Sequence, residues 1–544
     1  MNLDLEGAPL DEAGLRRLQE TLSGGRDNPA ADRLIAHALA LGACFTITET
    51  PYTDQDYSAD FVGFYASAFK TYPRHTSRIH FFAEDVSGLF ELPFCEQQVA
   101  LANARSYLGF VVVRPIAQGP IGRTVLGFPK LGDDLVVRPA ARATFKVHLY
   151  GAKLEIDGAP FIQQDTRVGA CAQAAIWMAN RTLHERHGRC GWHPISDITR
   201  LATTPTDPDL SKSLPAGSNG LSPLHITRAL RAMGHQPYCD IFLADDPETS
   251  RTDSDDPTAD KPSPVPSVVR YLDSGLPVIM GMAKFGGQAG HAVTAVGYVE
   301  TKGGALRDAD SYDGFIRAII VHDDQRGPYR LLPVTPGDVE HLPADLLLNG
   351  EVPVSLEDTV THIFVPMSPR VFLIADHADI VARHFLRDYG ARLAGAALAK
   401  LEPSDTEGTD AVARFIKALE DGQIIRRTYL TTAGRYRHHL AKGDLAEAAK
   451  VEAITRTLPH FIWVTELLYR DADQTRDGGA REIVGHIVIN ATSSTDQNSD
   501  LLFAHLPRIV IHRNVDPPEG SQQAYEESAT LVDGPVGYAQ RLRI

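Results

Sequence analysis

The stretch QQDTRVGACAQAAIWM, residues 163–178, decides how the rest of the chain is interpreted. Alanine and other apolar residues recur at helical intervals after Cys171, so a helix is predicted to begin at or just before that cysteine. The positive end of a helix dipole stabilises a thiolate, which is the attacking form of cysteine. Cys171 is therefore a candidate nucleophile, and the alternative is a small cysteine that only packs in the core.

A histidine that could act as the base for Cys171 opens a later strand. The segment HAVTAVGYV begins at His291, after the strand-like segment LPVIMGM (276–282) and the glycine-rich turn GGQAG (286–290). A histidine at the edge of a sheet can face a cysteine at the start of a helix and take its proton. The two residues are 291 − 171 = 120 positions apart, so the fold must return the chain to one site.

Composition and charge restrict the class of protein. The chain has 53 Lys and Arg against 69 Asp and Glu, a net charge of −16, which repels phosphate backbones and argues against nucleic acid as a partner. Five cysteines are too few and odd in number for a disulfide framework. The acidic N-terminus lacks a signal-peptide pattern, and no apolar run reaches the roughly 20 residues that span a bilayer. We expect a soluble, cytoplasmic protein without membrane partners.

Shifts in pattern divide the 544 residues into three predicted domains. Residues 1–144 mix amphipathic helix with β-branched strands such as SYLGFVVVRPI (106–116) and form an α+β domain. Residues 145–367 contain the cysteine helix, a helix from Pro223 stopped by Gly234, an acidic exposed loop at 244–266 and several strands. The pattern resets near residue 368, so 368–544 is predicted to be a separate α/β domain.

The order of these motifs resembles the papain-like cysteine peptidase superfamily, and within it the C39-like peptidases. The resemblance lies in the glutamine-rich loop, the cysteine at a helix start, the PVI strand, the GHAV strand and the strand IIVHDD (319–324), all within residues 145–367. It implies an α+β multidomain protein with a central papain-like domain, in which an N-terminal helix carries the cysteine and an antiparallel sheet carries the histidine and acid.

The resemblance also implies roles for individual residues. Cys171 would attack a carbonyl group, and His291 would accept the thiol proton and later protonate the leaving group. The family's orienting acid lies on the next strand, which matches Asp323. Asp324 is the alternative, although it would face the other way on a regular strand, and His322 is interpreted as a neighbour.

Gln164 is the candidate side chain for the oxyanion hole, together with the N–H of Cys171. In the family the glutamine stands six residues before the cysteine, whereas here that position is Asp165, with Gln164 seven and Gln163 eight residues before it. Ala172 stands where many relatives have glycine. Both departures leave the loop geometry open.

Two further motifs have simpler explanations. The segment LHERHGRCGWH spaces His184, His187, Cys190 and His193 at intervals of three, and these side chains suit zinc. Such spacing spreads them around a helix, so a histidine-rich helix end is the preferred interpretation. The glycines of GPIGRT (119–124) and GGQAG do not match nucleotide-binding patterns. No metal or cofactor is expected.

The sequence therefore predicts a cysteine peptidase that cuts a peptide or isopeptide bond through a thioester acyl-enzyme. Two alternatives remain: an acyltransferase of the transglutaminase type, and a catalytically inactive papain-like protein that binds peptides or regulates another protein. The flanking domains are expected to select a protein or peptide substrate, and a regulatory protein partner is a further hypothesis.

Overall fold

The fold is given by a computed structural model, which describes residues 4–165, 170–188, 190–204, 221–242, 263–283, 290–302, 307, 310–348, 354–470, 475–476, 480–493, 500–512 and 529–532. Most of the predicted acidic loop 244–266 and of the turn 286–290 lies outside these residues. With 39% helix and 32% strand in several sheets, the predicted multidomain α+β class is confirmed.

The chain forms two compact units, each built from several chain segments. Unit 1 contains Met1–Pro264, Leu276–Val299 and Arg317–Met367, and unit 2 contains Val265–Gly275, Glu300–Ile316 and Ser368–Ile544. The predicted three-domain division stays a prediction.

The first sheet of unit 1 is antiparallel, with strand order β1-β2-β3-β4-β5-β8-β7. Its strands are β1 (Asp4–Pro9), β2 (Phe45–Tyr52), β3 (Thr76–Phe82), β4 (Tyr107–Val113), β5 (Ile121–Leu126), β7 (Ala143–Leu149) and β8 (Ala152–Phe161). Helices and turns between them are α1 (Glu12–Ser23), α2 (Pro29–Ala40), α3 (Gln55–Gly63), η1 (Tyr65–Ser67), η2 (Ser87–Glu91) and α4 (Phe94–Ala102).

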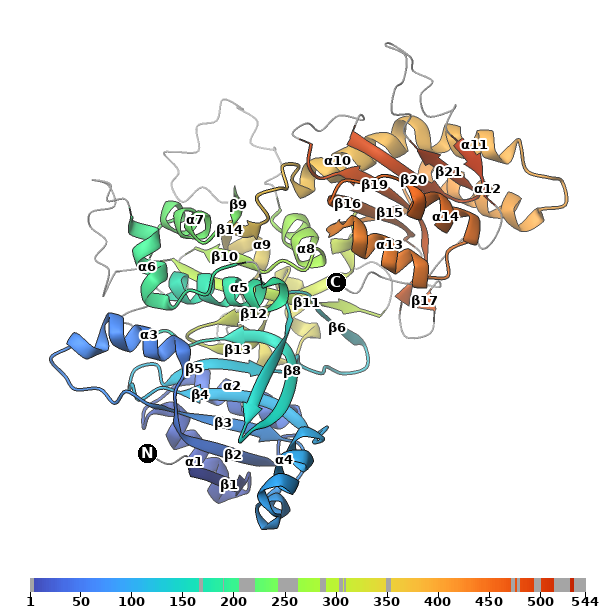
Figure 1. The fold of residues 1–544 in the computed structure, drawn as a ribbon. Coiled ribbons are helices and arrows are strands. Elements are labelled where there is room, and N and C mark those ends of the chain that lie inside the picture. Colours follow the sequence, from blue (N-terminus) through green and yellow to red (C-terminus); the bar gives the residue numbers. More distant parts are fainter. Residues whose placement is uncertain are drawn as a thin grey trace. The chain divides into compact units, whose positions relative to one another are not determined.

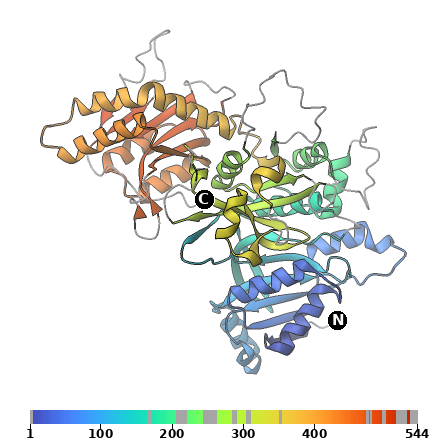
Figure 2. The same ribbon diagram turned by 180° about the vertical axis from the view of Figure 1, so that it is seen from behind.

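Alternation along the strands gives the first sheet two buried faces. Phe81 and Val111 point to the face covered by α1 and α2, which Figure 2 shows across the sheet. Phe82, Phe110 and Val112 point to the opposite face, where they pack with residues of α4 and of the β7–β8 hairpin. The sheet is therefore the centre of two hydrophobic layers.

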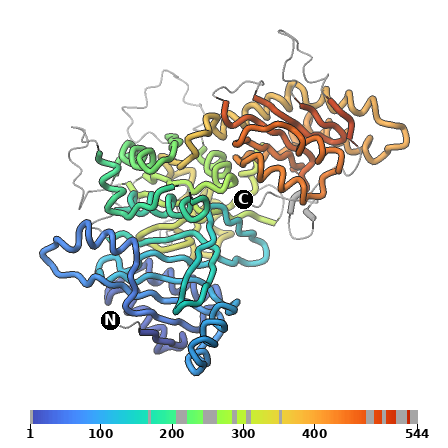
Figure 3. The backbone as a smooth tube through the Cα atoms, in the orientation of Figure 1, coloured from blue at the N-terminus to red at the C-terminus, as the bar shows by residue number. Residues whose placement is uncertain are grey.

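The second sheet of unit 1 has the strand order β13-β12-β11-β10-β14-β9, and β6 also pairs with β11. Its strands are β6 (Leu135–Pro139), β9 (Gln236–Ile241), β10 (Val278–Met282), β11 (His291–Thr301), β12 (Ile316–Asp323), β13 (Gly327–Pro333) and β14 (Val360–Met367). The other elements here are α5 (Cys171–His187), α6 (Ile195–Thr203), α7 (Pro223–Ala232), η4 (Pro336–His341), η5 (Ala344–Leu346) and α9 (Leu356–Thr359). Figure 3 follows the chain through α5 to β14 from green to yellow, whereas β6 comes from the earlier cyan part.

Helix α5 packs on the second sheet through the apolar residues that predominate in its first three turns. Ala174, Ala175 and Trp177 are buried with Ile279 of β10 and Val296 of β11 in one hydrophobic cluster. Burying such side chains contributes about 1.5–3 kcal/mol for each large residue. This packing fixes the start of α5 relative to the strands.

Unit 2 has helices on both faces of one antiparallel sheet, in the order β15-β16-β19-β20-β21-β22 (Figure 1). Its strands are β15 (Ile424–Thr432), β16 (Phe461–Tyr469), β19 (Ile483–Asn490), β20 (Leu501–Leu506), β21 (Ile509–His512) and β22 (Ala529–Leu531), and β17 (Thr475–Arg476) pairs with β18 (Ala480–Arg481). Its helices and turns are α8 (Val265–Asp273), η3 (Tyr312–Phe315), α10 (Ala375–Phe385), the π-helical turn η6 (Leu386–Gly390), α11 (Ala391–Leu398), α12 (Thr406–Glu420), α13 (Ala433–Lys442) and α14 (Glu447–Thr455).

Ion pairs tie the two interposed segments of unit 2 to its sheet. Arg427 of β15 binds Asp273 of α8 at 2.8 and 2.9 Å and Glu466 of β16 at 3.0 Å. Its neighbour Arg426 binds Asp310 at 3.0 Å. These contacts hold residues 265–275 and 300–316 in unit 2, although the chain on either side of each segment belongs to unit 1.

Across the described residues, every helix is too short or too polar to cross a bilayer.

Candidate active site

Cys171 is the first residue of α5, as the sequence predicted. The side-chain oxygen of Gln173 accepts the N–H of Ala170 at 3.3 Å, and the N–H of Ala174 donates to the carbonyl of Ala170 at 3.1 Å. These two bonds fix the beginning of the helix. Cys171 is half-buried and is a free thiol. It therefore lies at the N-terminal end of the helix, which is the positive end of the helix dipole.

The rest of α5 is held by a buried aspartate of α3. Asp56 accepts the indole N–H of Trp177 at 2.9 Å and binds the guanidinium of Arg181 at 2.8 and 2.9 Å. Sequence reasoning missed this contact because Asp56 is far away along the chain. The signal available was the i, i+4 spacing of Trp177 and Arg181, which places both on one helix face.

His291 begins β11 and is bonded to Asp323, the last residue of β12. His291 Nε2 lies 3.0 Å from Asp323 Oδ2, and both side chains are buried. Three residues further along β11, the Thr294 hydroxyl Oγ1 donates to the backbone carbonyl of Ala175 at 3.1 Å, which connects β11 directly to α5. The strand that carries the histidine is thus bonded to the helix that carries the cysteine.

The loop after β12 orients the Asp323 carboxylate. Its Oδ1 accepts the backbone N–H groups of Gln325 and Arg326 at 2.8 and 3.0 Å, and its Oδ2 lies 3.3 Å from Arg326 Nη1. Burial would raise the pKa of Asp323, but the charge and hydrogen bond of His291 lower that pKa to about 2. Asp323 is therefore ionised at neutral pH.

His291 is held in its protonated form by these neighbours. Burial lowers the pKa of His291, but the Asp323 carboxylate and a hydrogen bond with the Cys171 side chain raise it well above the usual value. Because Asp323 occupies Nε2, Nδ1 is the ring nitrogen left for the thiol. The structure thus brings Cys171, His291 and Asp323 together, with His291 between the thiol and the carboxylate.

Asp324 also lies beside His291, although regular alternation predicts that it faces away. Its Oδ1 is 3.9 Å from His291 Nε2, and its side chain is fully buried. β12 ends at Asp323, after a register shift between Val321 and Asp323, and Asp324 is the first residue of the following turn, where strand alternation no longer applies. Sequence periodicity could not predict such a local shift.

The three side chains of His291, Asp323 and Asp324 are the one described group whose donor atoms lie close enough together, within 4.8 Å, to suit a metal ion. The guanidinium of Arg326 beside Asp323 opposes a cation there. The four zinc candidates do not form such a group: His184 Nδ1 instead lies 2.7 Å from the backbone carbonyl of Cys190.

The three polar residues of the glutamine loop, Gln163, Gln164 and Asp165, have different surroundings. Gln163 exchanges hydrogen bonds with the side chain of Asn28, with Nε2 to Oδ1 at 2.8 Å. Asp165, which stands at the family's glutamine position, accepts a hydrogen bond from Tyr65. Gln164 is half-buried, but residues 166–169, which separate this loop from α5, lie outside the described residues. Its role in the oxyanion hole stays a prediction.

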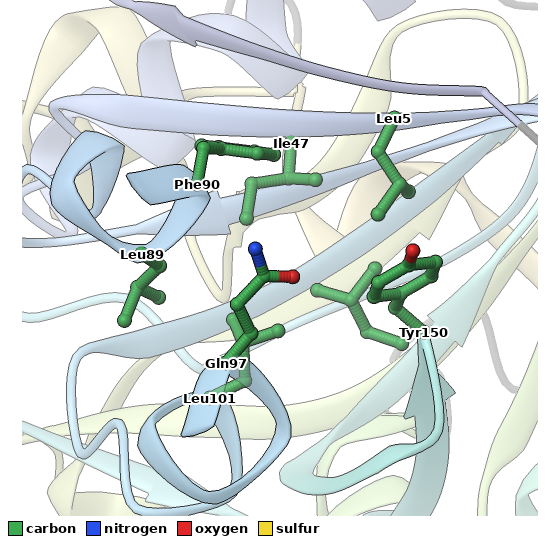
Figure 4. Close-up of a pocket in the computed structure, with 8 residues that line it drawn as sticks. Leu5, Ile47, Leu89, Phe90, Gln97, Leu101 and Tyr150 are labelled. Atoms are coloured by element: carbon green, nitrogen blue, oxygen red, sulfur yellow. The ribbon is translucent and has the colours of Figure 1, made fainter. Parts of the chain in front are cut away.

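A small pocket lies in unit 1 between η2, α4 and the first sheet. Figure 4 shows its lining, which includes Phe90, Gln97 and Tyr150. The Gln97 amide donates to the carbonyl of Leu92 at 2.9 Å, and the other lining residues are almost all apolar. The pocket contains none of the candidate catalytic residues.

Comparisons with known proteins found no similarity: no family model, no curated protein and no solved structure matches the chain.

Proposed function

We propose that this protein is a papain-like cysteine hydrolase that cleaves a peptide or isopeptide bond. The observation that carries the proposal is the juxtaposition of Cys171, at the first residue of α5, with His291, whose Nε2 lies 3.0 Å from the Asp323 carboxylate. A helix start, an imidazolium and a buried carboxylate each favour the thiolate form of cysteine.

In the resting pair the thiol proton of Cys171 has already passed to His291 Nδ1, and the reaction begins when the Cys171 thiolate attacks the carbonyl carbon of the substrate. The N–H of Cys171 faces the developing oxyanion. The tetrahedral intermediate collapses as the C–N bond breaks, and His291 gives its proton to the leaving amine. Water then attacks the thioester with His291 as base, which releases a carboxylic acid and restores the thiol.

Asp323 has a supporting role throughout this cycle. It accepts the Nε2–H of His291, fixes the orientation of the ring and stabilises the imidazolium that each proton transfer produces. Its own orientation is fixed by the backbone N–H groups of Gln325 and Arg326, so the carboxylate does not have to reorganise during the reaction.

The proposal is tested by labelling the full chain with a neutral thiol electrophile between pH 5 and 9 and mapping the modified cysteines by mass spectrometry. The exposed Cys44, Cys95 and Cys239 provide internal references. We expect Cys171 to react fastest at low pH, and His291→Ala to abolish that advantage. A peptide library would then identify substrates, with Cys171→Ala as the inactive control. Equal reactivity of Cys171 and the reference cysteines would refute the proposal.

A binding or regulatory protein is the second candidate, and the glutamine loop favours it. The Gln163 amide is bonded to Asn28, and the residue at the family's glutamine position is Asp165, bonded to Tyr65. Neither side chain is then an oxyanion donor. Selective labelling of Cys171 without turnover of any peptide or isopeptide in the library would support this candidate.

A further inference from the structure

Asp324 is a buried carboxyl group that the proposed mechanism does not use. Its side chain is fully buried, and apart from its own backbone N–H neither of its oxygens has a hydrogen-bond partner among the described residues. Buried polar groups are nearly always hydrogen-bonded, because an unsatisfied one carries its full desolvation cost. A purely structural role would not explain why this position holds an acid.

Three groups from the surrounding elements face Asp324. His291 of β11 lies 3.9 Å away, Asp323 precedes it on β12, and Arg326 of the following turn adds a positive charge. The preceding residue, His322, is neutral: burial lowers the pKa of its imidazole to about 3, and its Nδ1 lies 3.2 Å from the Pro160 carbonyl. Asp324 therefore interacts with the charge of His291 and with the competing charge of Asp323.

Two adjacent carboxyl groups in a buried site do not both ionise at the same pH. Asp323 has the hydrogen bonds that stabilise an anion: one from His291, two from backbone N–H groups and one from Arg326. Asp324 has none of these. The geometry thus divides the pair into an anion, Asp323, and a group that holds a proton, Asp324.

We propose that Asp324 is a positioning residue whose loss of a proton adds a second negative charge beside His291 and thereby strengthens the Cys171 thiolate–His291 imidazolium pair. This inference rests on the proposed function, because it describes the control of that same pair. The proton of Asp324 leaves to solvent, and the substrate is not touched by this carboxyl group.

The pKa values agree with this division. Burial and the charge of Asp323 together raise the pKa of Asp324 to about 7, whereas the charge of His291 acts in the opposite direction. The carboxyl group is therefore neutral in mildly acidic solution and ionised in mildly alkaline solution. The reactivity of Cys171 should accordingly rise as the pH passes through neutrality.

The test is the rate of Cys171 alkylation by iodoacetamide in the full chain, measured from pH 5 to 9 with EDTA present to remove metal ions. In the wild type we expect an increase of several-fold centred near pH 7. In Asp324→Asn this increase should be absent, because no second carboxylate forms beside His291. The pKa at which the His291 imidazolium loses its proton should also fall by about one unit. A wild-type profile that Asp324→Asn leaves unchanged would overturn the inference.

Asp60→Asn is a matched control. Asp60 of α3 is a second buried acid whose pKa burial raises to about 7, but it accepts a hydrogen bond from the N–H of Ser196 and does not contact His291. Its replacement removes a titration in the same pH range, so it should leave the Cys171 profile unaltered. If Asp60→Asn also lost the rise in Cys171 reactivity near pH 7, that rise would come from the titration of buried acids elsewhere in unit 1. This result would overturn the role of Asp324.

The remaining outcomes separate this inference from the proposed function. If wild-type Cys171 shows no reactivity that depends on His291, both fail; if that reactivity is present but has no step near pH 7, only the role of Asp324 fails. If Asp324→Asn does not fold, an infrared pH titration of Asp60→Asn takes its place. That variant lacks the other buried acid that titrates near pH 7, so the protonated carboxyl signal in this range comes from Asp324. A protonated carboxyl band lost in parallel with the rise in reactivity supports the inference, and its absence above pH 5 overturns it.

Discussion

Replacement of Asp323 by asparagine should weaken the reactive pair without removing either member. Asp323→Asn keeps the size of the side chain but removes the charge that lies 3.0 Å from His291 Nε2. Burial, which lowers the pKa of His291, is then opposed by fewer groups. The imidazole becomes easier to deprotonate, so less of Cys171 exists as the thiolate at acidic pH.

The size of the effect follows from the kind of bond that is lost. A hydrogen bond to a charged group contributes about 1.5–3 kcal/mol, and about 1.4 kcal/mol corresponds to one pKa unit. Because Asp323 is fully buried, solvent screening does not reduce this contribution much. We expect the pKa of His291 to fall by about one to two units and the alkylation rate of Cys171 at pH 6 to fall about 10- to 100-fold.

The assay is a time course of iodoacetamide labelling at pH 6 and pH 9, read by mass spectrometry of the Cys171 peptide. At pH 9 free thiolate forms without help from His291, so the difference between the variants should be small. Asp197→Asn is the control, because Asp197 forms a half-exposed pair with Arg200 on α6. A rate at pH 6 within about twofold of the wild type would refute the role of Asp323.

Two further predictions concern unit 2. Arg427→Met leaves Asp273 and Glu466 buried without their cation, so the free energy of unfolding measured by denaturant titration should fall by about 3–5 kcal/mol. Arg456→Met is the control: it breaks the half-exposed pair with Glu452, and the free energy of unfolding should fall by less than about 1 kcal/mol. Burial lowers the pKa of His505 to about 4, so the unfolded state binds a proton first as the pH falls, and stability is lost from about pH 6.5 downwards. His505→Leu should remove about 3 kcal/mol of the stability difference between pH 7 and pH 4, and an unchanged difference would contradict this account.

Local signals predicted most of the elements around the site. The helix that begins at Cys171 and the strand that begins at His291 are confirmed, because glycine-rich turns and hydrophobic periodicity act over a few residues. The helix from Pro223 is likewise confirmed, with Ser222 as its cap and Gly234 just beyond its end. These features need no knowledge of distant contacts.

Features that depend on distant contacts could not be predicted. Asp56 meets Arg181 only after α3 and α5 have packed together, and Asp273 meets Arg427 across 154 positions of sequence. Asp324 lies beside His291 because β12 ends at Asp323 and the chain turns there, whereas periodicity treats the strand as continuing. Ion pairs and strand irregularities leave little trace in a single sequence.

The segmented construction of unit 2 imposes an order on biosynthesis. Asp273 leaves the ribosome 154 residues before Arg427, its buried partner, which at ordinary rates of translation is a delay of roughly 8–30 s. Asp310, in the stretch that joins the His291 strand to the Asp323 strand, waits for Arg426 in the same way. During that interval both acids remain without these two cations. Cys171 and His291 have therefore both been synthesised before Arg426 and Arg427 can form these ion pairs in unit 2.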